Sequence, residues 1–518
     1  MKKMSAWQFA LVAAGFGGVF CMSLSADAAE GEDLTSLSIK INQGKLSSVQ
    51  VLKTYQARIA ALNPSVQAVI ALRPQAEEEA LFSDQQTKNV LPLHGLPILV
   101  KDNIDVSRMT TTAGSLALVN NFAAVDAHLV ARLRAAGAII VGKTNLSEWA
   151  NFRSSKATSG WSSAGGQTRN PYALANSPCG SSSGSGAAVA ARMIPAAIGT
   201  ETDGSIVCPA AVNGLVGLKP TVGLVSRGGI VPLSHSQDTA GPMTLTVRDA
   251  ALLMNVLVGS DPLDPATKEA DKRRAIDYLA GLSKQGLRGK RLGIVSKLVD
   301  DYDAQTKAVF KRSLAVLRAQ GAIIVDHLTL PYLDDLEKDE MTVLLYEFKA
   351  DLNTYLATTP AGVSTRSMAD VIAFNKDHAD SVMPYFSQEI MEQAQATGTL
   401  NDSIYLEAKS RAKQHAGIDG IDATLKKYHL DALIAPTTGV AWAIDYKAGD
   451  VIAGSASTPA AVAGYPHLTV PMGMVNELPV GLSFFAGAWS DAALLKMAYA
   501  FEQARPKIAA PKLDISKQ

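Results

Sequence analysis

The sequence predicts an α/β fold with a largely parallel or mixed sheet. Short apolar segments of four or five residues recur along the 518-residue chain, and segments with one apolar helical face lie between them. Buried apolar strands that alternate with helices are typical of this fold class. The expected strands are residues 96–100, 138–141, 322–325, 432–435 and 468–470.

Three segments have the spacing and the end signals of helices. The first begins after Ser47, buries apolar residues at helical spacing over 52–62, and is expected to stop at Asn63-Pro64. The second covers 127–136 and ends at a glycine, directly before the expected buried strand 138–141. The same order of helix, glycine and buried strand recurs over residues 307–325.

The composition limits the class of protein. Hydrophobic residues make up 47% and charged residues 19%, which excludes a mostly disordered chain. The 48 Lys and Arg balance the 48 Asp and Glu, so no global basic field favours nucleic acid as a partner. The length alone suggests about three domains, but no long linker divides the chain, and we expect one large domain.

The first 28 residues have the composition of a secretory signal peptide. Two lysines follow the initiating Met, residues 6–22 are almost wholly apolar, and Ala-Asp-Ala at 26–28 fits a small-x-small cleavage site. We therefore expect 1–28 to be removed and 29–518 to form a single domain, exported to the periplasm or secreted. A membrane anchor is the alternative, but the apolar run is slightly short for a spanning helix, and we expect no stable membrane insertion after cleavage.

The most informative stretch covers residues 177–220. It begins Ser-Pro-Cys-Gly-Ser-Ser-Ser-Gly-Ser-Gly, contains Gly-Thr-Glu-Thr-Asp-Gly-Ser-Ile at 199–206, and ends Gly-Leu-Val-Gly-Leu-Lys-Pro. A flexible linker is disfavoured because an Ala-rich helical segment follows at once. A phosphate loop lacks the Gly-Lys-Ser/Thr that should follow. A nucleophile elbow at 180–184 needs a preceding strand, whereas 169–178 has loop chemistry.

The same stretch resembles the motif of the amidase signature family. Further blocks similar to that family lie at 95–103, 142–149 and 464–471, so the resemblance covers nearly the whole chain after residue 28. It implies the amidase signature fold, a large mixed central sheet surrounded by helices. Within the family, residues 199–209 and Leu-Leu-Tyr-Glu-Phe-Lys at 344–349 are similar to bacterial peptide amidases.

The resemblance assigns catalytic roles to three residues. The family uses a Ser–cis-Ser–Lys triad, which maps to Ser205 as nucleophile, Ser181 as proton relay and Lys101 as base. The two serines are 24 residues apart, as in the family. A cis peptide before Ser181 is also implied. The oxyanion hole would be formed by backbone N–H groups of Thr202, Asp203, Gly204 and Ser205.

Elementary chemistry agrees with these roles. A serine hydroxyl needs an adjacent base to become a good nucleophile. A lysine with a pKa of about 10.4 is neutral in only about one molecule in a few thousand at pH 7, and burial lowers that pKa. Lys101 follows an apolar segment, so we expect it at the end of a buried strand. The alternative is a surface lysine whose stem alone is buried.

The chain departs from the common family pattern at two positions. Glu201 stands where most members have Asp, and Asp203 stands where most have Gly. The first change keeps a carboxylate, and the second keeps the backbone donors of the oxyanion loop. The added carboxylate of Asp203 either alters substrate choice or is simply solvated or caps the backbone.

No cofactor or metal is expected. Neither His-Glu-x-x-His nor Cys-x-x-Cys occurs in the sequence. Cys179 and Cys208 remain after signal removal, and export would permit a disulfide between them. Because the sequence does not show whether their Cα atoms come within bridging range, we expect two buried thiols, with a disulfide as the alternative.

The sequence therefore predicts an exported serine-dependent amidase acting on linear amides. The expected substrates are C-terminal peptide amides, and a broader carboxamide or cyclic-amide hydrolase of the same family is the alternative. An exported solute-binding protein would share the signal peptide, size and fold class, but it has no need for this lysine and two serines. The expected partner is a small-molecule or peptide amide.

Overall fold

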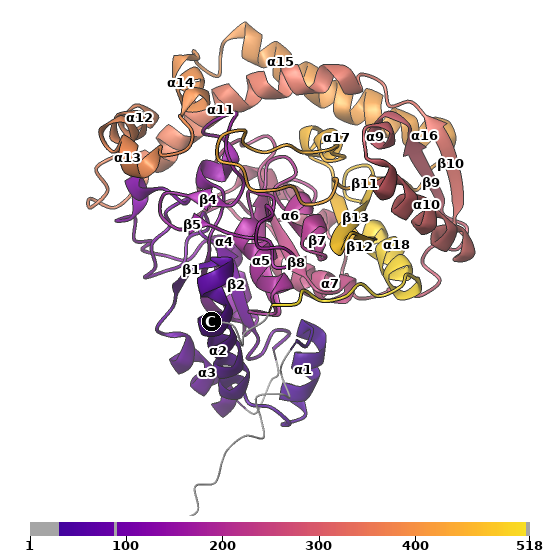
Figure 1. Ribbon diagram of the computed structural model, residues 1–518, viewed down its shortest axis with the longest axis horizontal. Coiled ribbons are helices and arrows are strands. Elements are labelled where there is room, and N and C mark those ends of the chain that lie inside the picture. The colour runs from indigo at the N-terminus through magenta and orange to yellow at the C-terminus, as the bar shows by residue number, and fades with distance from the viewer. Residues whose placement is uncertain (1–30, 87–90, 514–518) are drawn as a thin grey trace, which may run out of the picture.

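The computed structural model describes residues 31–86 and 91–513 (Figure 1). The expected signal peptide, 1–28, lies outside the described residues. Eleven strands form the central sheet, and β4 (Trp161–Ser162) and β5 (Gly166–Gln167) form a separate pair. The central strands are β1 (Val69–Leu72), β2 (Pro97–Lys101), β3 (Ile139–Thr144), β6 (Ala196–Glu201), β7 (Val216–Lys219), β8 (Thr239–Thr244), β9 (Arg291–Val295), β10 (Ile323–Leu328), β11 (Ala432–Pro436), β12 (His467–Val475) and β13 (Leu478–Phe485).

The sheet is mixed, as predicted. Its strand order is β1-β3-β2-β6-β8-β7-β12-β13-β11-β9-β10. β2 lies between β3 and β6 and runs parallel to both, whereas the neighbours from β6 to β11 pair antiparallel. At the far side, β11, β9 and β10 are parallel again. The carboxyl ends of β2 and β6 therefore open at the same edge of the sheet.

Helices surround the sheet and fall into two groups. One group comprises N-terminal helices and helices that pack on the strands: α1 (Leu34–Asn42), α2 (Ser48–Val66), α3 (Ala76–Gln85), α4 (His128–Ala135), α5 (Ser183–Ala190), α6 (Val207–Val212), α7 (Val247–Leu257), α9 (Lys297–Asp300), α10 (Ala304–Ala319) and α18 (Asp491–Ala504). The short helix α8 (Ala270–Arg273) packs on the turn that precedes it. The second group forms an outer helical layer: α11 (Leu336–Thr358), α12 (Met368–Asp377), α13 (Ala379–Val382), α14 (Glu389–Ala396), α15 (Ser403–Lys413), a π-helical turn (Gln414–Asp422), α16 (Ala423–Tyr428) and α17 (Thr458–Ala463).

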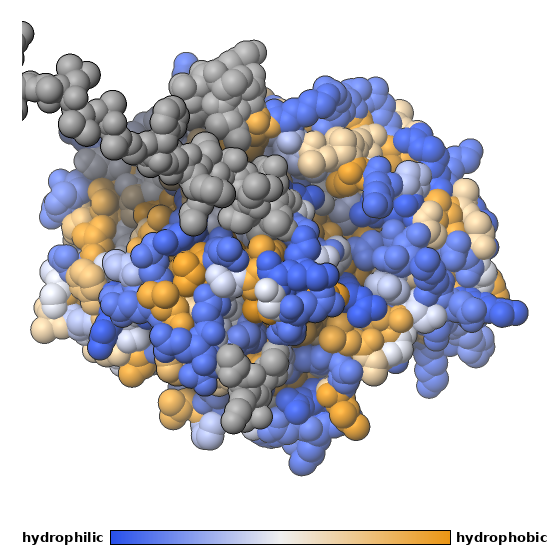
Figure 2. Space-filling view, turned by 90° about the horizontal axis from the view of Figure 1, so that it is seen from below, coloured by the Kyte–Doolittle hydropathy of each residue, from blue (hydrophilic) through white to orange (hydrophobic). Residues whose placement is uncertain are grey.

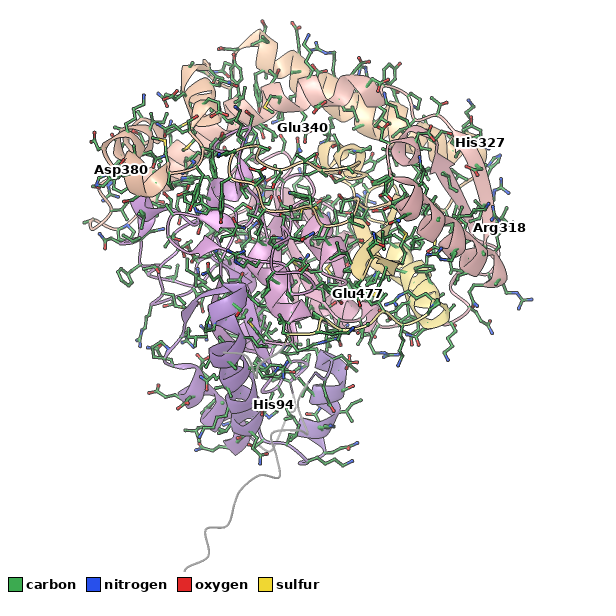
Figure 3. The ribbon with its side chains drawn as sticks, viewed as in Figure 1. His94, Arg318, His327, Glu340, Asp380 and Glu477 are labelled. Atoms are coloured by element: carbon green, nitrogen blue, oxygen red, sulfur yellow. A yellow bond between two sulfur atoms is a disulfide. The ribbon has the colours of Figure 1, made fainter. Side chains whose placement is uncertain are left out.

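The outer helical layer covers the edge of the sheet at which the candidate catalytic residues Lys101 and Ser205 lie. Figure 1 shows α11 and α15 running side by side across the top of the molecule, above α17. Figure 3 labels Glu340, which α11 carries on the side toward the loops of the sheet. A residue of the outer layer is thereby brought close to segments that precede it by more than a hundred positions.

One helix boundary differs from the sequence expectation. Helix α2 does not stop at Asn63 but continues through Pro64 to Val66. The proline is tolerated because it lies in the last turn, where the Gln67 N–H still donates to the Asn63 carbonyl at 2.8 Å. The Asn63 side chain also accepts from the N–H of Val69 at 2.8 Å and so completes the helix end.

The segment expected as a buried strand at 322–325 is an edge strand. Within the described part of the chain β10 pairs with β9 alone, and Ile323 remains 47% exposed. The apolar residues of 322–325 predict a strand, but they do not show how many other strands will pair with it. β3, with the same local pattern, is buried throughout because strands flank it on both sides.

The outer surface is mixed in polarity. Figure 2, seen from below, shows apolar residues scattered among hydrophilic ones. No helix among the described residues combines the length and apolar composition that a membrane crossing requires.

Candidate active site

Lys101 is the last residue of β2, and its amine is enclosed. The residue is fully buried, and its strand is flanked by β3 and β6. Its Nζ lies 2.7 Å from Ser181 Oγ and 2.8 Å from Thr200 Oγ1. Asn103 donates to the same Thr200 hydroxyl at 3.0 Å and helps to orient it. The predicted position at the end of a buried strand is confirmed.

The surroundings of this amine favour its neutral form. Burial lowers the pKa of Lys101 to about 7, and the more distant carboxylates of Asp238 and Glu201 oppose the shift only in part. A large fraction of the amine is therefore unprotonated near neutral pH. In that state Nζ can accept a proton from the Ser181 hydroxyl.

Ser181 lies in a tight turn between the loop formed by residues 169–178 and helix α5. The Gly180–Ser181 peptide is cis, as the resemblance implied. The Ser183 hydroxyl donates to the carbonyl of Cys179 at 2.6 Å and closes the turn. At Gly184 a side chain could not fit, because a Cβ would lie 2.3 Å from the Ala68 carbonyl oxygen. The Gly- and Ser-rich sequence therefore allows neighbouring backbone segments to pack closely, and it is not a flexible linker.

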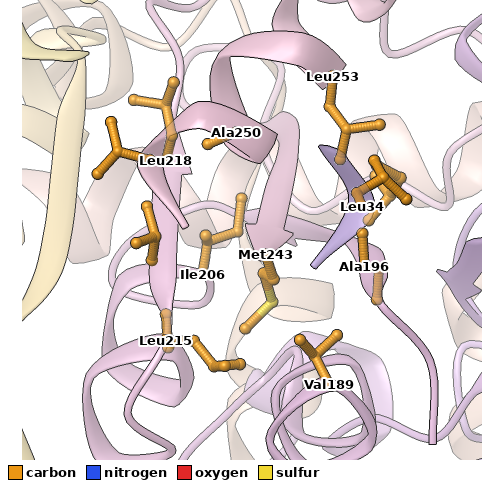
Figure 4. Packing of buried hydrophobic residues seen from close by; sticks show 14 of the residues in the cluster. Leu34, Val189, Ala196, Ile206, Leu215, Leu218, Met243, Ala250 and Leu253 are labelled. Carbon is orange, nitrogen blue, oxygen red and sulfur yellow. The ribbon is translucent and has the colours of Figure 1, made fainter. Parts of the chain in front are cut away.

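Ser205 lies on the loop that leads from β6 to α6. Gly204 before it has a φ of +75°, a conformation that favours glycine. The Glu201 carboxylate accepts from the N–H groups of Ile206 and Val207 at 2.7 and 2.9 Å and holds the start of α6. The Ile206 side chain packs in the core with Leu215 and Met243 (Figure 4). In the sequence, Ser205 therefore lies between Glu201, whose carboxylate is held by hydrogen bonds, and Ile206, whose side chain is anchored in the core.

The two serine turns are joined directly. The N–H of Ser182 donates to the carbonyl of Ser205 at 3.1 Å. Ser181 is fully buried, whereas Ser205 is 7% exposed. The structure thus brings Lys101, Ser181 and Ser205 together, with Ser205 toward the open side, and their catalytic roles remain predictions.

The oxyanion candidates form a loop with unused donors. In the hydrogen-bond network of residues 31–86 and 91–513, no acceptor is paired with the backbone N–H of Asp203, Gly204 or Ser205. The loop is braced from behind, since the Thr202 hydroxyl donates to Asp238 at 2.6 Å. Unpaired N–H groups beside a serine hydroxyl are suited to bind a developing oxyanion.

A disulfide links the same two turns, which corrects the expectation of two free thiols. Cys179 precedes the cis turn, and Cys208 follows Ser205 by three residues. Their Cα atoms lie 6.0 Å apart, within bridging range. The sequence separation of 29 residues hid this proximity, which arises because the two turns pack against each other.

Ser205 opens into a cavity of about 300 Å³. One part of its wall is polar and comes from the oxyanion loop and α17, and another part is apolar. A larger cavity of about 540 Å³ beside His235 and Trp489 does not include Ser205. The cavity of Ser205 is lined among others by Phe152, Cys179, Asp203, Leu233, Glu340 and Leu344.

Sequence reasoning missed two partners of the site. Thr200 lies within the quoted stretch 199–206, and its position five residues before Ser205 on β6 was the available signal. Glu340 itself carried no signal, although the block 344–349, which is similar to peptide amidases, begins four residues further along the same helix. The Glu340 side chain enters the cavity only because α11 crosses this edge of the sheet.

One cluster has donor atoms at metal-binding distance. His235, Glu347 and Asp351 offer ligand atoms within 4.8 Å of one another. The Lys409 amine lies 3.0 Å from Glu347 Oε1 and 2.9 Å from His235 Nε2, so two of the three residues already have an amine as partner. The cluster is therefore explained as an ion-pair network that ties α11 and α15 to the loop at 235.

Comparison with known proteins agrees with this geometry. Residues 50–495 match a family model described as Amidase. The peptide amidase of Stenotrophomonas maltophilia is 49% identical, with a TM-score of 0.88 over 93% of this chain and 98% of its own. The structure of peptide amidase PAM with the competitive inhibitor chymostatin is 50% identical, with a TM-score of 0.90 over 93% and 99% of the two chains.

A plant relative shows similar coverage at lower identity. A probable amidase of Arabidopsis thaliana is 39% identical over 484 residues, which span 91% of this chain and 89% of the relative. The likeness therefore extends over almost the whole of both chains and is not confined to the stretch 177–220.

Proposed function

This chain belongs to the amidase signature family, and we propose that it is an exported amidase that hydrolyses C-terminal peptide amides. The family makes it a hydrolase of amide bonds and sets aside the solute-binding alternative. The substrate class, the roles of individual residues and the export are the parts that we add.

The proposed reaction uses the two serines and the lysine in series. Ser205 Oγ bonds to the carbonyl carbon while its proton passes to Ser181 Oγ, and the proton of Ser181 passes to neutral Lys101 Nζ. The proton then returns through Ser181 to the leaving nitrogen as the C–N bond breaks, and ammonia departs. Water attacks the acyl-enzyme by the same proton route and releases the carboxylic acid.

The oxyanion loop stabilises the charge that develops in this reaction. When Ser205 attacks, the carbonyl oxygen becomes negative and needs donors that are already in place. We assign this task to the backbone N–H groups of Thr202, Asp203, Gly204 and Ser205.

The observation that carries the proposal is the contact between Lys101 and Ser181. An amine that is fully buried, has a pKa near 7 and lies 2.7 Å from a serine hydroxyl has the properties of a general base. A lysine kept only for packing would gain more from a carboxylate partner than from two hydroxyl groups.

The choice of peptide amides is supported by similarity and by the cavity. Two structures of peptide amidase are about half identical to this chain over nearly its full length. The cavity beside Ser205 combines apolar side chains with acceptors, as a peptide chain requires.

A substrate panel tests this choice. Ammonia release is measured from N-acylated dipeptide amides, from the matching free acids and from small aliphatic amides. We expect kcat/KM to be largest for the peptide amides, and chymostatin to compete with them. Equal rates for small aliphatic or cyclic amides would instead favour the broader hydrolase. Labelling of Ser205 by a fluorophosphonate probe reports on the nucleophile independently.

Export is supported by the disulfide between Cys179 and Cys208, since such bonds persist in oxidising compartments. We propose that residues 1–28 are a signal peptide and that 29–518 form the mature amidase domain. N-terminal sequencing of the protein recovered outside the cytoplasm should begin at Ala29. A mature chain that still begins at Met1 would contradict the cleavage.

A further inference from the structure

Asp203 and Glu340 form a carboxyl pair in the cavity of Ser205, outside the proton relay. Asp203 belongs to the oxyanion loop, and Glu340 comes from α11 in the outer layer. Glu340 is 6% exposed, and Asp203 Oδ1 has no access to solvent. The two carboxyl groups lie within hydrogen-bonding reach of each other. A hydrogen bond between them requires that one proton be shared.

The surroundings favour retention of that proton. Burial, and then the neighbouring Asp203 carboxylate, raise the pKa of Glu340 well above its usual range. Burial also raises the pKa of Asp203, against the opposing effects of Ser457, Thr458 and the Lys219 amine. Of the two groups, Glu340 is held more strongly in its protonated, donating form, which leaves Asp203 as the acceptor.

Asp203 keeps an acceptor position that the protein does not fill. The Thr458 hydroxyl donates to its Oδ2 at 2.7 Å, whereas no donor among the described residues is paired with its buried Oδ1. An ionised carboxylate accepts about four hydrogen bonds. Gln237 donates to Glu340 at 2.7 Å and holds that side chain in place. A buried acceptor without a donor is costly, which points to a donor supplied by the substrate.

Two helices hold the pair in the cavity of Ser205. The Thr458 hydroxyl of α17 donates to Asp203, and Glu340 belongs to α11. The leaving nitrogen must lie at Ser181, because it takes its proton there, which leaves the rest of the cavity to the acyl group. Leu344, one turn further along α11, lines the same cavity and offers an apolar surface to the acyl chain.

We propose that the Asp203–Glu340 pair accepts the N–H of the substrate residue whose carboxamide is cleaved. This inference rests on the proposed function and specifies how peptide amides are distinguished from simple amides. The α-nitrogen of that residue is two bonds from the carbonyl carbon that Ser205 attacks, and Asp203 is two residues before Ser205. A simple aliphatic amide has no donor at that position, so it leaves the carboxylate unpaired.

The test compares two substrates that differ only in this donor. N-acetyl-phenylalanine amide carries the N–H, and its depsi analogue has an ester oxygen there. Ammonia release reports hydrolysis of the carboxamide in both. We expect the wild-type enzyme to prefer the N–H substrate by about ten- to a hundredfold in kcat/KM. Because the readout is a ratio, a partly folded variant does not distort it.

Three variants and one control separate the pair from a structural role. Asp203→Ala and Glu340→Met should reduce the preference to within about threefold. Glu340→Gln should retain most of it, because its amide N–H donates to Asp203 as the protonated carboxyl does. Glu407→Gln removes an exposed carboxylate from the neighbouring helix α15 and should leave the ratio unchanged.

The outcomes separate this inference from the proposed function. A wild-type enzyme inactive toward both substrates overturns the proposed function, and the pair's assignment with it. An active enzyme whose preference survives Asp203→Ala, or falls equally in Glu407→Gln and Glu340→Met, overturns the assignment alone.

Discussion

Two fully buried lysines lie on neighbouring strands and differ in what surrounds the amine. Lys101 ends β2, and Lys143 lies on β3, paired in register with Val100. Lys143 Nζ is 3.0 Å from a carboxylate oxygen of Asp102. Lys101 Nζ instead contacts two hydroxyl groups and a backbone carbonyl.

This difference shows how one residue type serves two purposes in one sheet. A carboxylate at contact distance favours the charged amine and makes a buried ion pair, which is disrupted at high cost when one partner is lost. Hydroxyl partners do not offset the desolvation of an ammonium, so burial lowers the pKa of Lys101 to about 7. We therefore expect Lys143 to act on stability and Lys101 on catalysis.

The largest expected effect is that of Ser205→Ala. Loss of the nucleophile should lower kcat by about 10⁴-fold or more, while the free energy of unfolding should stay close to that of the wild type, because only one hydroxyl at the cavity is removed. Ammonia release and chemical denaturation measure the two quantities. Activity within tenfold of the wild type would refute the assignment of the nucleophile.

Substitution of Lys101 should reduce activity without a matching loss of stability. Lys101→Met removes the base at similar volume, and we expect kcat/KM to fall by roughly a thousandfold. Lys101→Arg should not restore it, since a guanidinium stays protonated. Substantial activity in Lys101→Arg would show that the residue is only structural.

Lys143→Met is the matched variant on the neighbouring strand, and its effect should be on stability. It leaves the buried Asp102 carboxylate without its cation, which costs roughly 3–5 kcal/mol of unfolding free energy. The double variant with Asp102→Asn should recover part of this loss. If Lys143→Met left stability intact but abolished turnover of the folded fraction, the division of roles between the two lysines would be wrong.

The smallest expected effect is the pH dependence of kcat/KM, which we expect Lys101, and not Lys143, to control. The Lys101 amine must be neutral to act as base, so kcat/KM should rise with pH and level off above about 7. Below that pH it should fall about tenfold per pH unit. A pH series on the wild type and on the folded fraction of Lys143→Met should give the same midpoint, and a midpoint that moves in Lys143→Met contradicts the comparison.

Much of the fold followed from local sequence. The apolar segments at 96–100, 138–141 and 432–435 became strands because short uncharged runs are stable when a sheet covers both of their faces. The segment at 322–325 has the same local pattern as 138–141, yet it became an exposed edge strand. A local pattern of apolar residues does not specify how many neighbouring strands a strand receives. Helix α2 continues past its proline because hydrogen bonds of Asn63, some from beyond the helix, support its end.

The amino-acid sequence was enough to identify the family, the mixed sheet and the three residues to test, because Lys101, Ser181 and Ser205 lie in short motifs of fixed spacing. The packed chain was needed to show that the Lys101 amine is enclosed without a carboxylate contact, and that Cys179 is bonded to Cys208. It was also needed to place Glu340 beside Asp203. These features depend on burial and on distances between remote segments, and such quantities exist only once the chain has folded.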